Sequence, residues 1–331
     1  MLLRIFRNTD PFVIFLIVAA VVLFCLNSLL NPGIESTTFY DEDPMPLYAL
    51  LRAVTANNYF AGVIITMLMM LLIAYMLVSL NTSVIFIDER TFLPAIIYIL
   101  LVSLFPDYLV LNPALPAALL LIAAVRKIMD TYRVQGIAYD LYDAGFLISA
   151  GSLFYANFIF FGILVIAGII LLRSVVFKEL LLALLGFLTP WILISAIWYV
   201  SGKEAFEVLD LLNNNIRADM PDYIQELLPV LLLIFPGMLV LISILHLLSV
   251  INTKKIKSRN TFYLLLWVLV ISGAVFTISP SVSVDIIWLA GIPAAYFLSH
   301  YFVFMRNKTV KEISFTILFL AVIFMHLIKF I

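Results

Sequence analysis

The stretch "FLPAIIYILLVSLFPDYLVLNPALPAALLLIAAVRKI", residues 92–128, decides the fold class. It is almost continuously apolar, Pro106 and Pro113 separate its two halves, and Arg126 and Lys127 lie near its end. Apolar runs without the alternation of barrel strands predict helices within a bilayer. Its two halves, 92–105 and 111–125, are shorter than the roughly 20 residues of a comfortable crossing. We therefore expect short or half-crossing helices that are buried in protein.

The composition of the whole chain agrees with this stretch. Of 331 residues, 65% are hydrophobic and 12% are charged, whereas a soluble domain carries about 25% charged residues. The mean hydropathy is +1.17. These values predict an all-α polytopic integral membrane protein that forms a single membrane domain over residues 1–331, without a soluble domain. The one cysteine, Cys25, excludes an internal disulfide.

About eleven transmembrane helices are expected from the apolar segments. The first is interpreted as an uncleaved span, because a small-residue cleavage pattern does not follow it. The expected spans are 11–30, 58–80, 92–105, 111–125, 144–156, 157–172, 179–200, 227–250, 261–278, 286–304 and 313–331.

The basic residues give these spans an orientation. With the N-terminus in the cytoplasm, all but four of the 19 Lys and Arg residues fall on the cytoplasmic side, as the positive-inside rule requires. This places the C-terminus outside. The four exceptions are Arg52, Lys203, Arg217 and Lys329.

The opposite side is correspondingly acidic. Two long external loops are expected there, 31–57 and 201–226, and the C-terminal helices follow over 227–331. The expected external acids are Glu35, Asp41, Glu42, Asp43, Asp107, Glu204, Glu207, Asp210, Asp219, Asp222, Glu226 and Asp285.

Several kinds of chemistry lack support in the sequence. A phosphate-binding glycine loop, a nucleophile elbow and a cysteine pair are absent. His246, His300 and His326 lie in three different spans without metal-ligand spacing, which favours packing roles. Charges within the spans are scarce, which disfavours a proton-coupled transporter. Asp143 is expected to cap the cytoplasmic N-terminus of a short helix.

The densest block of negative charge lies in "FYDEDPMPLYALLRA", residues 39–53. A carboxylate at the membrane surface can act as a general base, and several together can hold a divalent cation. The following segment has Leu47, Leu50, Leu51 and Val54 at helical spacing, which predicts an interfacial helix that brings Arg52 near lipid phosphates. A solvated acidic loop followed by a plain amphipathic connector is the equally weighted alternative.

This order of elements resembles the GT-C superfamily of membrane glycosyltransferases over residues 11–200. An acidic first external loop, an interfacial helix, short helices joined by tight turns, "YDAGFLISAGSLFYANFIFFGILVIAGIILL" and the pair Pro190–Trp191 carry the resemblance. Tyr155 occupies the family's lysine position, and the large C-terminal external domain of many members is missing. The whole chain also resembles an uncharacterised family of Bacteroidota multi-pass membrane proteins, through its "TDPF" start and its "DAGFLI" core.

The GT-C resemblance implies a glycosyltransferase of the bacterial inner membrane that uses a polyprenyl-phosphate-linked sugar at the external face. In that case Asp41 or Glu42 is the catalytic base and Asp43 a helper or metal ligand for a divalent cation. Arg52 and Asp107 then contact the substrate or its lipid phosphate. Membrane lipids and envelope membrane proteins are the other expected partners, and nucleic acid is not. Two alternatives stay open, a non-catalytic subunit of an envelope or secretion complex and, more weakly, a lipid or solute transporter.

Overall fold

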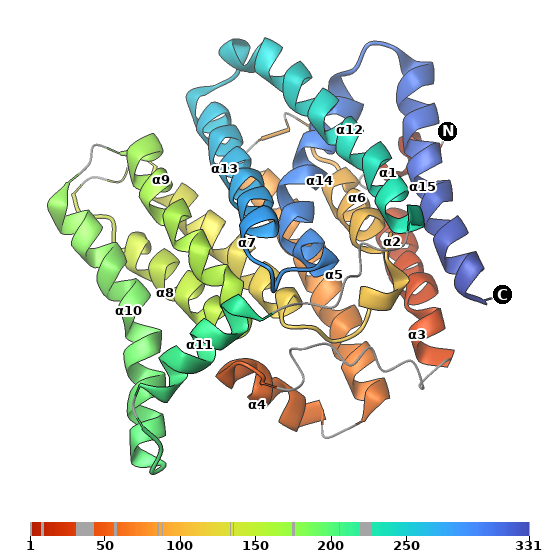
Figure 1. Cartoon of the computed structure of the whole chain (residues 1–331). Coiled ribbons are helices and arrows are strands. Elements are labelled where there is room, and N and C mark those ends of the chain that lie inside the picture. Colours follow the sequence, from red (N-terminus) through yellow and green to blue (C-terminus); the bar gives the residue numbers. More distant parts are fainter. Residues whose placement is uncertain are drawn as a thin grey trace.

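The computed structural model describes residues 2–7, 10–30, 43–55, 58–84, 86–87, 89–132, 134, 136–173, 176–204, 206–218 and 227–330. All regular elements in these ranges are helices, so the helical fold class is confirmed (Figure 1). The α-helices are α1 (Leu2–Arg7), α2 (Pro11–Phe24), α3 (Leu26–Leu30), α4 (Pro46–Thr55), α5 (Tyr59–Val84), α6 (Leu93–Val102), α7 (Ala114–Asp130), α8 (Asp140–Ser152), α9 (Gly162–Leu172), α10 (Phe177–Val200), α11 (Glu207–Arg217), α12 (Leu227–Val250), α13 (Ile256–Ile278), α14 (Ile287–Phe304) and α15 (Lys308–Phe330). Short 3-10 helices are η2 (Pro106–Tyr108), η3 (Ala156–Phe161), η5 (Ile251–Thr253) and η6 (Val284–Ile286).

Each expected span coincides with one or two of these helices. Within the described ranges, six helices are long and apolar enough to cross a membrane, so a membrane protein is supported while eleven crossings stay a prediction. The six are Tyr59–Ser83, Phe177–Val200, Leu233–Thr253, Ile256–Ile278, Val284–Phe304 and Lys308–Ile328.

The short helices form the centre of the bundle, as their length predicted. All ten residues of α6 are buried, although the helix is only about 15 Å long at 1.5 Å per residue. Helices α7 and α8 also bury most of one face. Because other helices surround them, their ends do not need to reach lipid or water on their own.

Two glycines set the closest helix crossing, between α8 and α10. A Cβ atom at Gly186 would overlap the carbonyl oxygen of Tyr142, and one at Gly145 would overlap that of Ala183. Small residues allow this approach between membrane helices, where van der Waals packing drives association.

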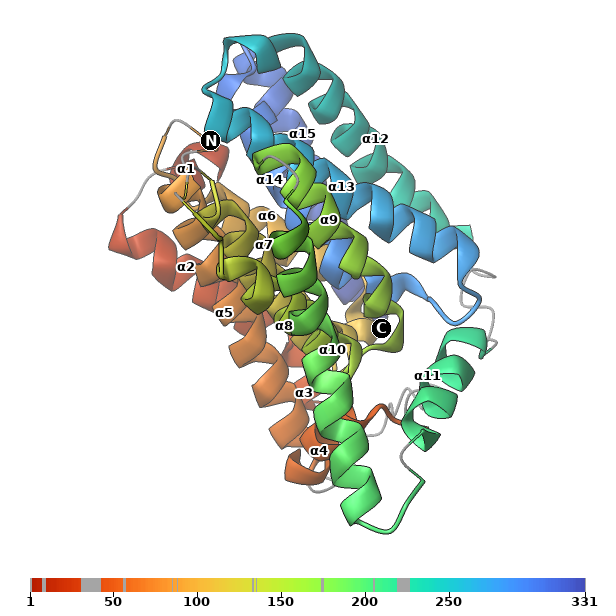
Figure 2. The same cartoon turned by 90° about the vertical axis from the view of Figure 1, so that its left-hand side faces the viewer.

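Contacts between distant segments bring basic residues to one end of the bundle, here called the basic end, where α1 and the α12–α13 turn lie (Figure 2). Arg7 pairs with Glu89 at 2.6 Å, and Lys257 donates to the carbonyl of Ser83 at 3.2 Å. Asn260, near the start of α13, donates to the carbonyl of Leu171 at the end of α9. The α12–α13 turn, the α9–α10 turn and α1 therefore share this end, as the positive-inside pattern requires.

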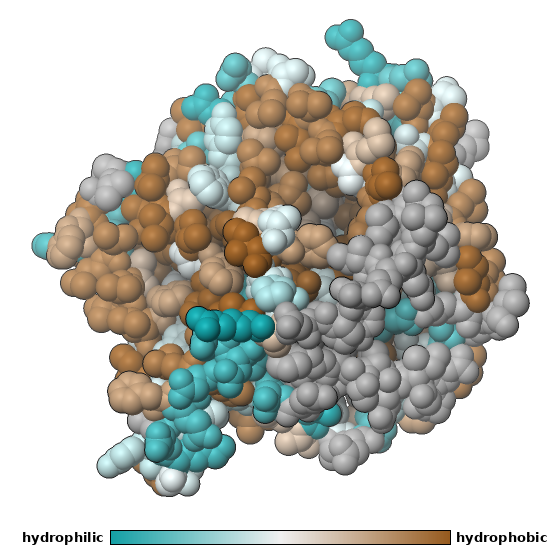
Figure 3. Space-filling model, viewed as in Figure 1, coloured by the Kyte–Doolittle hydropathy of each residue, from teal (hydrophilic) through white to brown (hydrophobic). Residues whose placement is uncertain are grey.

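Helices α4 and α11 lie at the opposite end, here called the α4/α11 end (Figure 2). Figure 3 shows hydrophobic surface over much of the bundle, with hydrophilic residues over α11 and at the α14–α15 turn. This arrangement matches a helical membrane protein with polar margins on both sides of an apolar belt.

Three local expectations differ from the structure. The first expected span is divided at Cys25, which lies between α2 and α3 in a turn conformation (φ −82°, ψ −1°). The expected loop 201–226 contains a helix, α11. The expected capping carboxylate of Asp143 lies in the first turn of α8, but it forms an ion pair with Lys127 at 2.7 Å.

Candidate functional site at the α4/α11 end

The acidic block lies at the start of this site. The predicted catalytic residues Asp41 and Glu42 lie outside the described residues, whereas Asp43 is described and exposed. The backbone carbonyl of Asp43 accepts a hydrogen bond from Nδ2 of Asn215 at 3.0 Å, although 172 residues separate the two. The segment that follows Asp41 and Glu42 is therefore held against α11.

Helix α4 forms as predicted, and contacts at its start fix it to the bundle. The amide of Leu47 donates to the carbonyl of Leu153 at 3.0 Å, and the Tyr48 hydroxyl donates to the carbonyl of Leu111 at 3.1 Å. Tyr48 is buried, while Leu50 and Val54 are 60% and 77% exposed. Two of the four residues of the predicted apolar face therefore point away from the protein, whereas Leu47 and Leu51 pack against its apolar clusters. Only part of the predicted face is free to lie on a lipid surface.

The two predicted phosphate contacts come from neighbouring segments. Arg52 is half-buried in the last turn of α4, and Asp107 is exposed in η2. The bond from Tyr48 to Leu111 brings the turn after η2 against α4. Their segments are thus brought together.

A metal centre is not formed by the described residues alone. Over those ranges, no group of three or more His, Cys, Asp or Glu side chains is arranged to hold an ion. A cation bound by Asp43 would need further ligands, for which the adjacent Asp41 and Glu42 are the nearest acids in the sequence.

Helix α11 is the main element that sequence reasoning missed. Val208 and Asn215 are fully buried, and Leu211, Leu212 and Ile216 pack against a small apolar cluster. Their spacing follows one face of a helix, a signal that was present within the expected loop. Glu207 and Asp210 lie exposed on its other side.

A neutral polar cluster lies beneath α11. Asn157 donates to the hydroxyl of Ser281 at 2.8 Å and accepts from the hydroxyl of Ser279 at 2.6 Å. Ser279 also lies 3.2 Å from the carbonyl oxygen of Ile216, which connects the cluster to α11. In the same connection, the buried carboxylate of Asp285 accepts from Ser283 at 2.7 Å. Alternating Ser residues in "SPSVSVD" (279–285) are the signal that could have indicated this extended, hydrogen-bonded segment.

An apolar groove of about 640 Å³ runs between α10 and α11. Several lining residues are strongly exposed, among them Ile192, Tyr199 and Phe206, so the groove opens to the side of the bundle. Apolar surface lies beside the hydrophilic side of α11 (Figure 3). The lining residues are Ile159, Phe187, Leu188, Trp191, Ile192, Ser195, Ala196, Tyr199, Phe206, Leu209 and Leu212.

The groove and the start of α4 share a wall. The small apolar cluster contains Met45, Trp191 and Val208, with Ile159 and Leu212 packed against it. Trp191, Ile159 and Leu212 also line the groove. Met45 is only two residues after Asp43, so the groove lies beside the start of α4 and not beside Arg52 near its end.

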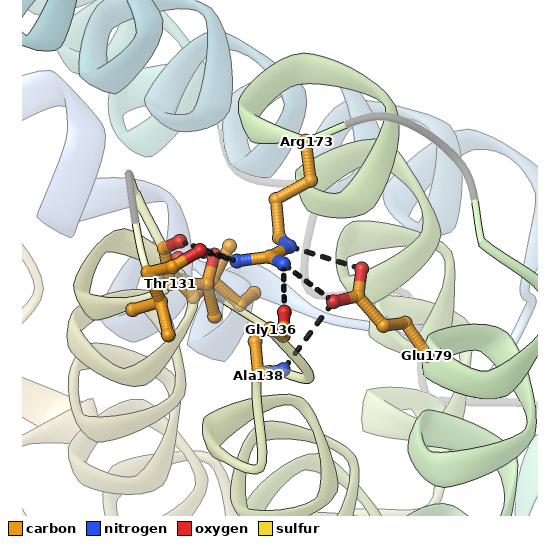
Figure 4. A network of polar contacts seen from close by, with 7 residues as sticks. Thr131, Gly136, Ala138, Arg173 and Glu179 are labelled. Carbon is orange, nitrogen blue, oxygen red and sulfur yellow. Dashed lines mark hydrogen bonds and ion pairs between the residues drawn. The ribbon is translucent and has the colours of Figure 1, made fainter.

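The basic end is held by a different kind of network, centred on Arg173 (Figure 4). Its guanidinium pairs with Glu179 through Nε at 3.0 Å and Nη2 at 2.7 Å. It also donates to three backbone carbonyls, those of Thr131, Val134 and Gly136, at 2.6–3.1 Å. Glu179 accepts in addition from the amide of Ala138 at 3.3 Å. This network connects the segment 131–138 to α9 and α10, and Gly136 supports it with a left-handed backbone (φ +82°).

Other ionisable groups at the basic end have structural partners too. Lys127 forms ion pairs with Asp143 at 2.7 Å and Asp140 at 3.0 Å. The hydrogen bond to Asp143, followed by the one to Asp140, raises the pKa of the Lys127 ammonium. These pairs join the end of α7 to the start of α8.

The three histidines take part in packing, as predicted. His326 stacks on Phe24 with ring centroids 5.2 Å apart, and its Nε2 lies 3.0 Å from the carbonyl oxygen of Ser103. The His246 and His300 rings lie 6.2 Å apart among aromatic side chains. All three connect helices that are distant in sequence.

Residues 46–331 match the model of a family of unknown function, DUF6427, and the chain therefore belongs to this family. The match begins at the first residue of α4, so it includes Arg52 and Asp107 but not Asp41, Glu42 or Asp43. No protein of curated function and no solved structure matches the chain.

Proposed function

We propose that this protein is a GT-C-like glycosyltransferase that takes a sugar from a polyprenyl-phosphate-linked donor at the α4/α11 end of the bundle. In this proposal Asp41 or Glu42 accepts the proton of the acceptor hydroxyl, because a carboxylate can act as a general base there. Asp43 assists directly or through a divalent cation. Arg52 and Asp107 orient the substrate from the last turn of α4 and from η2.

One observation carries the proposal, the wall that the apolar groove shares with the start of α4, which directly follows the acidic block in the sequence. A groove of about 640 Å³ is within the range of small-molecule sites, roughly 300–1,000 Å³. Its lining of Trp191, Leu188 and Ile192 suits an isoprenoid tail. Met45 belongs to the wall of the groove, and the acids Asp41, Glu42 and Asp43 precede it closely in the sequence. In this proposal a lipid tail in the groove and a general base therefore lie on neighbouring surfaces.

The proposed orientation puts the basic end in the cytoplasm and the α4/α11 end on the external face of a bacterial inner membrane. The gathering of basic residues such as Arg7, Arg173 and Lys257 at the basic end supports this orientation, through the positive-inside rule. The eleven crossings belong to the same proposal. A reporter fused after Ile331 should be active only outside the cytoplasm.

The enzymatic proposal is tested with the double substitution Asp41→Asn/Glu42→Gln. Membranes that contain the wild-type protein should transfer a radiolabelled sugar from polyprenyl-phosphate donors to endogenous acceptors. The rate of sugar transfer should be more than about 100-fold lower in the double variant, because general base catalysis contributes about 10²–10⁴-fold to a rate. Asp10→Asn, at the basic end, serves as the control. Full transfer by the double variant at equal expression would reject the assigned base.

A non-catalytic membrane subunit is the second candidate. The family match begins at Pro46 and omits the acidic triplet, which favours a role carried by the helices themselves. Glu207 and Asp210 would then offer an exposed docking face on α11. Charge reversal of both residues should release a partner complex from solubilised membranes, and it should leave sugar transfer unchanged.

A further inference from the structure

Lys311 lies on the buried face of α15, where helical spacing calls for an apolar residue. Phe315, Leu318 and Val322 occupy this face and are fully buried. Lys311 precedes Phe315 by four residues, about one turn of the helix. Helix α1 packs against this part of α15 (Figure 1), with the Phe6 and Phe315 rings 6.1 Å apart. Lys311 is therefore only 8% exposed.

A lysine that serves only to orient a membrane helix does not need this burial. Such residues lie at the polar margin of the membrane, as the exposed Arg306 and Lys308 do at the basic end. Over the part of the chain that the structure describes, the Lys311 ammonium has neither a hydrogen-bond acceptor nor an ion-pair partner. Withdrawing a charge from water without a partner is costly, so this ammonium calls for an anion.

The two acids that act on Lys311 are poorly placed to balance its charge. Glu89 instead accepts from Nε and Nη2 of Arg7, at 2.9 and 2.6 Å. Glu312 is the next residue in α15, and adjacent residues of a helix do not face each other. Arg7 and Lys308 act on Lys311 more strongly than either acid does, so positive charge dominates around its ammonium.

The N-terminus of α15 adds to this positive field. Oδ1 of Asn307 accepts from the amides of Thr309 and Val310, at 3.1 and 3.4 Å. The partial positive charge of a helix start favours acids in the first turn, yet the first turn of α15 has no acid. The Lys311 ammonium is not among the fully enclosed polar atoms, so a group at the surface can reach it.

We propose that Lys311, with Arg7 and Lys308, binds a phosphate group between α1 and α15 at the basic end. These three cations, set against Glu89 and Glu312, leave one net positive charge, which suits a phosphate with one negative charge. The phosphate comes either from the head group of an anionic phospholipid, which basic pockets between membrane helices bind, or from free phosphate. The site lies at the opposite end of the bundle from the groove and is independent of the proposed function.

Binding is measured as thermal stabilisation of the purified full chain in neutral detergent, because a ligand that binds only the folded state raises the melting temperature. The probes are phosphatidylglycerol, phosphatidylcholine and inorganic phosphate. Wild type should bind phosphatidylglycerol about tenfold more tightly than Lys311→Met and Lys311→Gln do, since both lose a hydrogen bond between charged groups. Lys311→Arg should keep the tight binding. Phosphatidylcholine, whose head group has no net charge, should not distinguish the variants. Without lipid, Lys311→Met should melt at or above the wild-type temperature, because it removes a buried charge without a partner.

Lys255→Met is the matched control, because it removes an exposed cation from the same end of the bundle. Its affinity for phosphatidylglycerol should equal that of wild type. Binding that depends on Lys311 supports the site, and it identifies a lipid head group if phosphatidylglycerol binds more tightly than inorganic phosphate, or free phosphate if the order is reversed. Equal responses of wild type and Lys311→Gln to both probes would overturn the proposal. So would a loss in Lys255→Met as large as in Lys311→Met, which would indicate general attraction to a positive surface.

Discussion

The two ends of the bundle are held together by different interactions. At the basic end, charged side chains bridge the helices, as in the Arg173–Glu179 network and the Arg7–Glu89 pair. At the α4/α11 end, neutral hydrogen bonds connect the segments instead. Asn215 donates to the backbone carbonyl of Asp43, and Asn157 bonds to Ser279 and Ser281. Among the described charges at the α4/α11 end, Asp43 and Lys203 are exposed, whereas the buried carboxylate of Asp285 accepts a hydrogen bond from the neutral Ser283 hydroxyl.

This difference bears on what each end can do. Ion pairs that are partly withdrawn from water fix geometry, because breaking one leaves a buried charge without its partner. Neutral hydrogen bonds contribute less each, about 0.5–1.5 kcal/mol, so an end built from them opens more easily. We infer that the basic end is the rigid base of the bundle and the α4/α11 end is the part that can move around a ligand.

The largest effect is expected at Arg173. Arg173→Met would leave Glu179, which is 1% exposed, without its main partner and would free three carbonyls. The free energy of unfolding should fall by about 3–5 kcal/mol. Thermal unfolding in detergent measures this, with the exposed neighbour Lys178→Met as the control. The double variant Arg173→Met/Glu179→Met should recover much of the loss. Equal melting of Arg173→Met and Lys178→Met would contradict the rigid-base interpretation.

A smaller effect is expected at Asn215. Asn215→Ala removes the bond to the Asp43 carbonyl from a side chain that is 1% exposed, and should cost about 1–2 kcal/mol. Hydrogen exchange should speed up in residues 43–55 and 207–217 and stay unchanged near Arg173. Asn214→Ala changes an exposed neighbour and should have no effect. Faster exchange at both ends would show that the two ends do not move independently.

The smallest effect is expected for the Arg7–Glu89 pair. Its side chains are 36% and 42% exposed, so water and salt screen the interaction. Arg7→Gln should lower the free energy of unfolding by less than about 1 kcal/mol, and the difference should shrink at 1 M salt. Denaturant titration at two salt concentrations measures both values. If Arg7→Gln lowered the free energy of unfolding as much as Arg173→Met does, the difference in burial between the two ion pairs would not determine how much each contributes to stability.

Much of the fold was predictable from local sequence. The apolar runs located the long apolar helices of the bundle but not α1 or α11, and the proline breaks located the short central helices. Helix α4 was predicted from the spacing of Leu47, Leu50, Leu51 and Val54; Leu50 and Val54 are exposed, and the other two pack against the protein. Hydropathy and helical spacing depend on neighbouring residues, so they can be read directly from the chain.

The candidate site was only partly predictable. Arg52 and Asp107 were assigned as substrate contacts from their positions in the chain, and the structure brings only their segments together. The groove depends on α10 and α11 meeting across a tight turn at Gly202, and its wall depends on Met45 packing against Trp191. Residues that are distant in sequence make these contacts, and no local pattern encodes which of them will meet.

By itself the sequence determined a helical membrane protein with basic and acidic sides, because the bilayer sorts apolar length and positive charge segment by segment. Tertiary structure decided which helices are central, which backbone carbonyls the Arg173 side chain binds, and where an apolar groove lies beside the start of α4. Such features arise from packing between segments that are distant in sequence, as in the contact between His326 and the carbonyl oxygen of Ser103, 223 residues away. Close packing selects among many apolar partners by shape, and shape exists only once the helices are assembled.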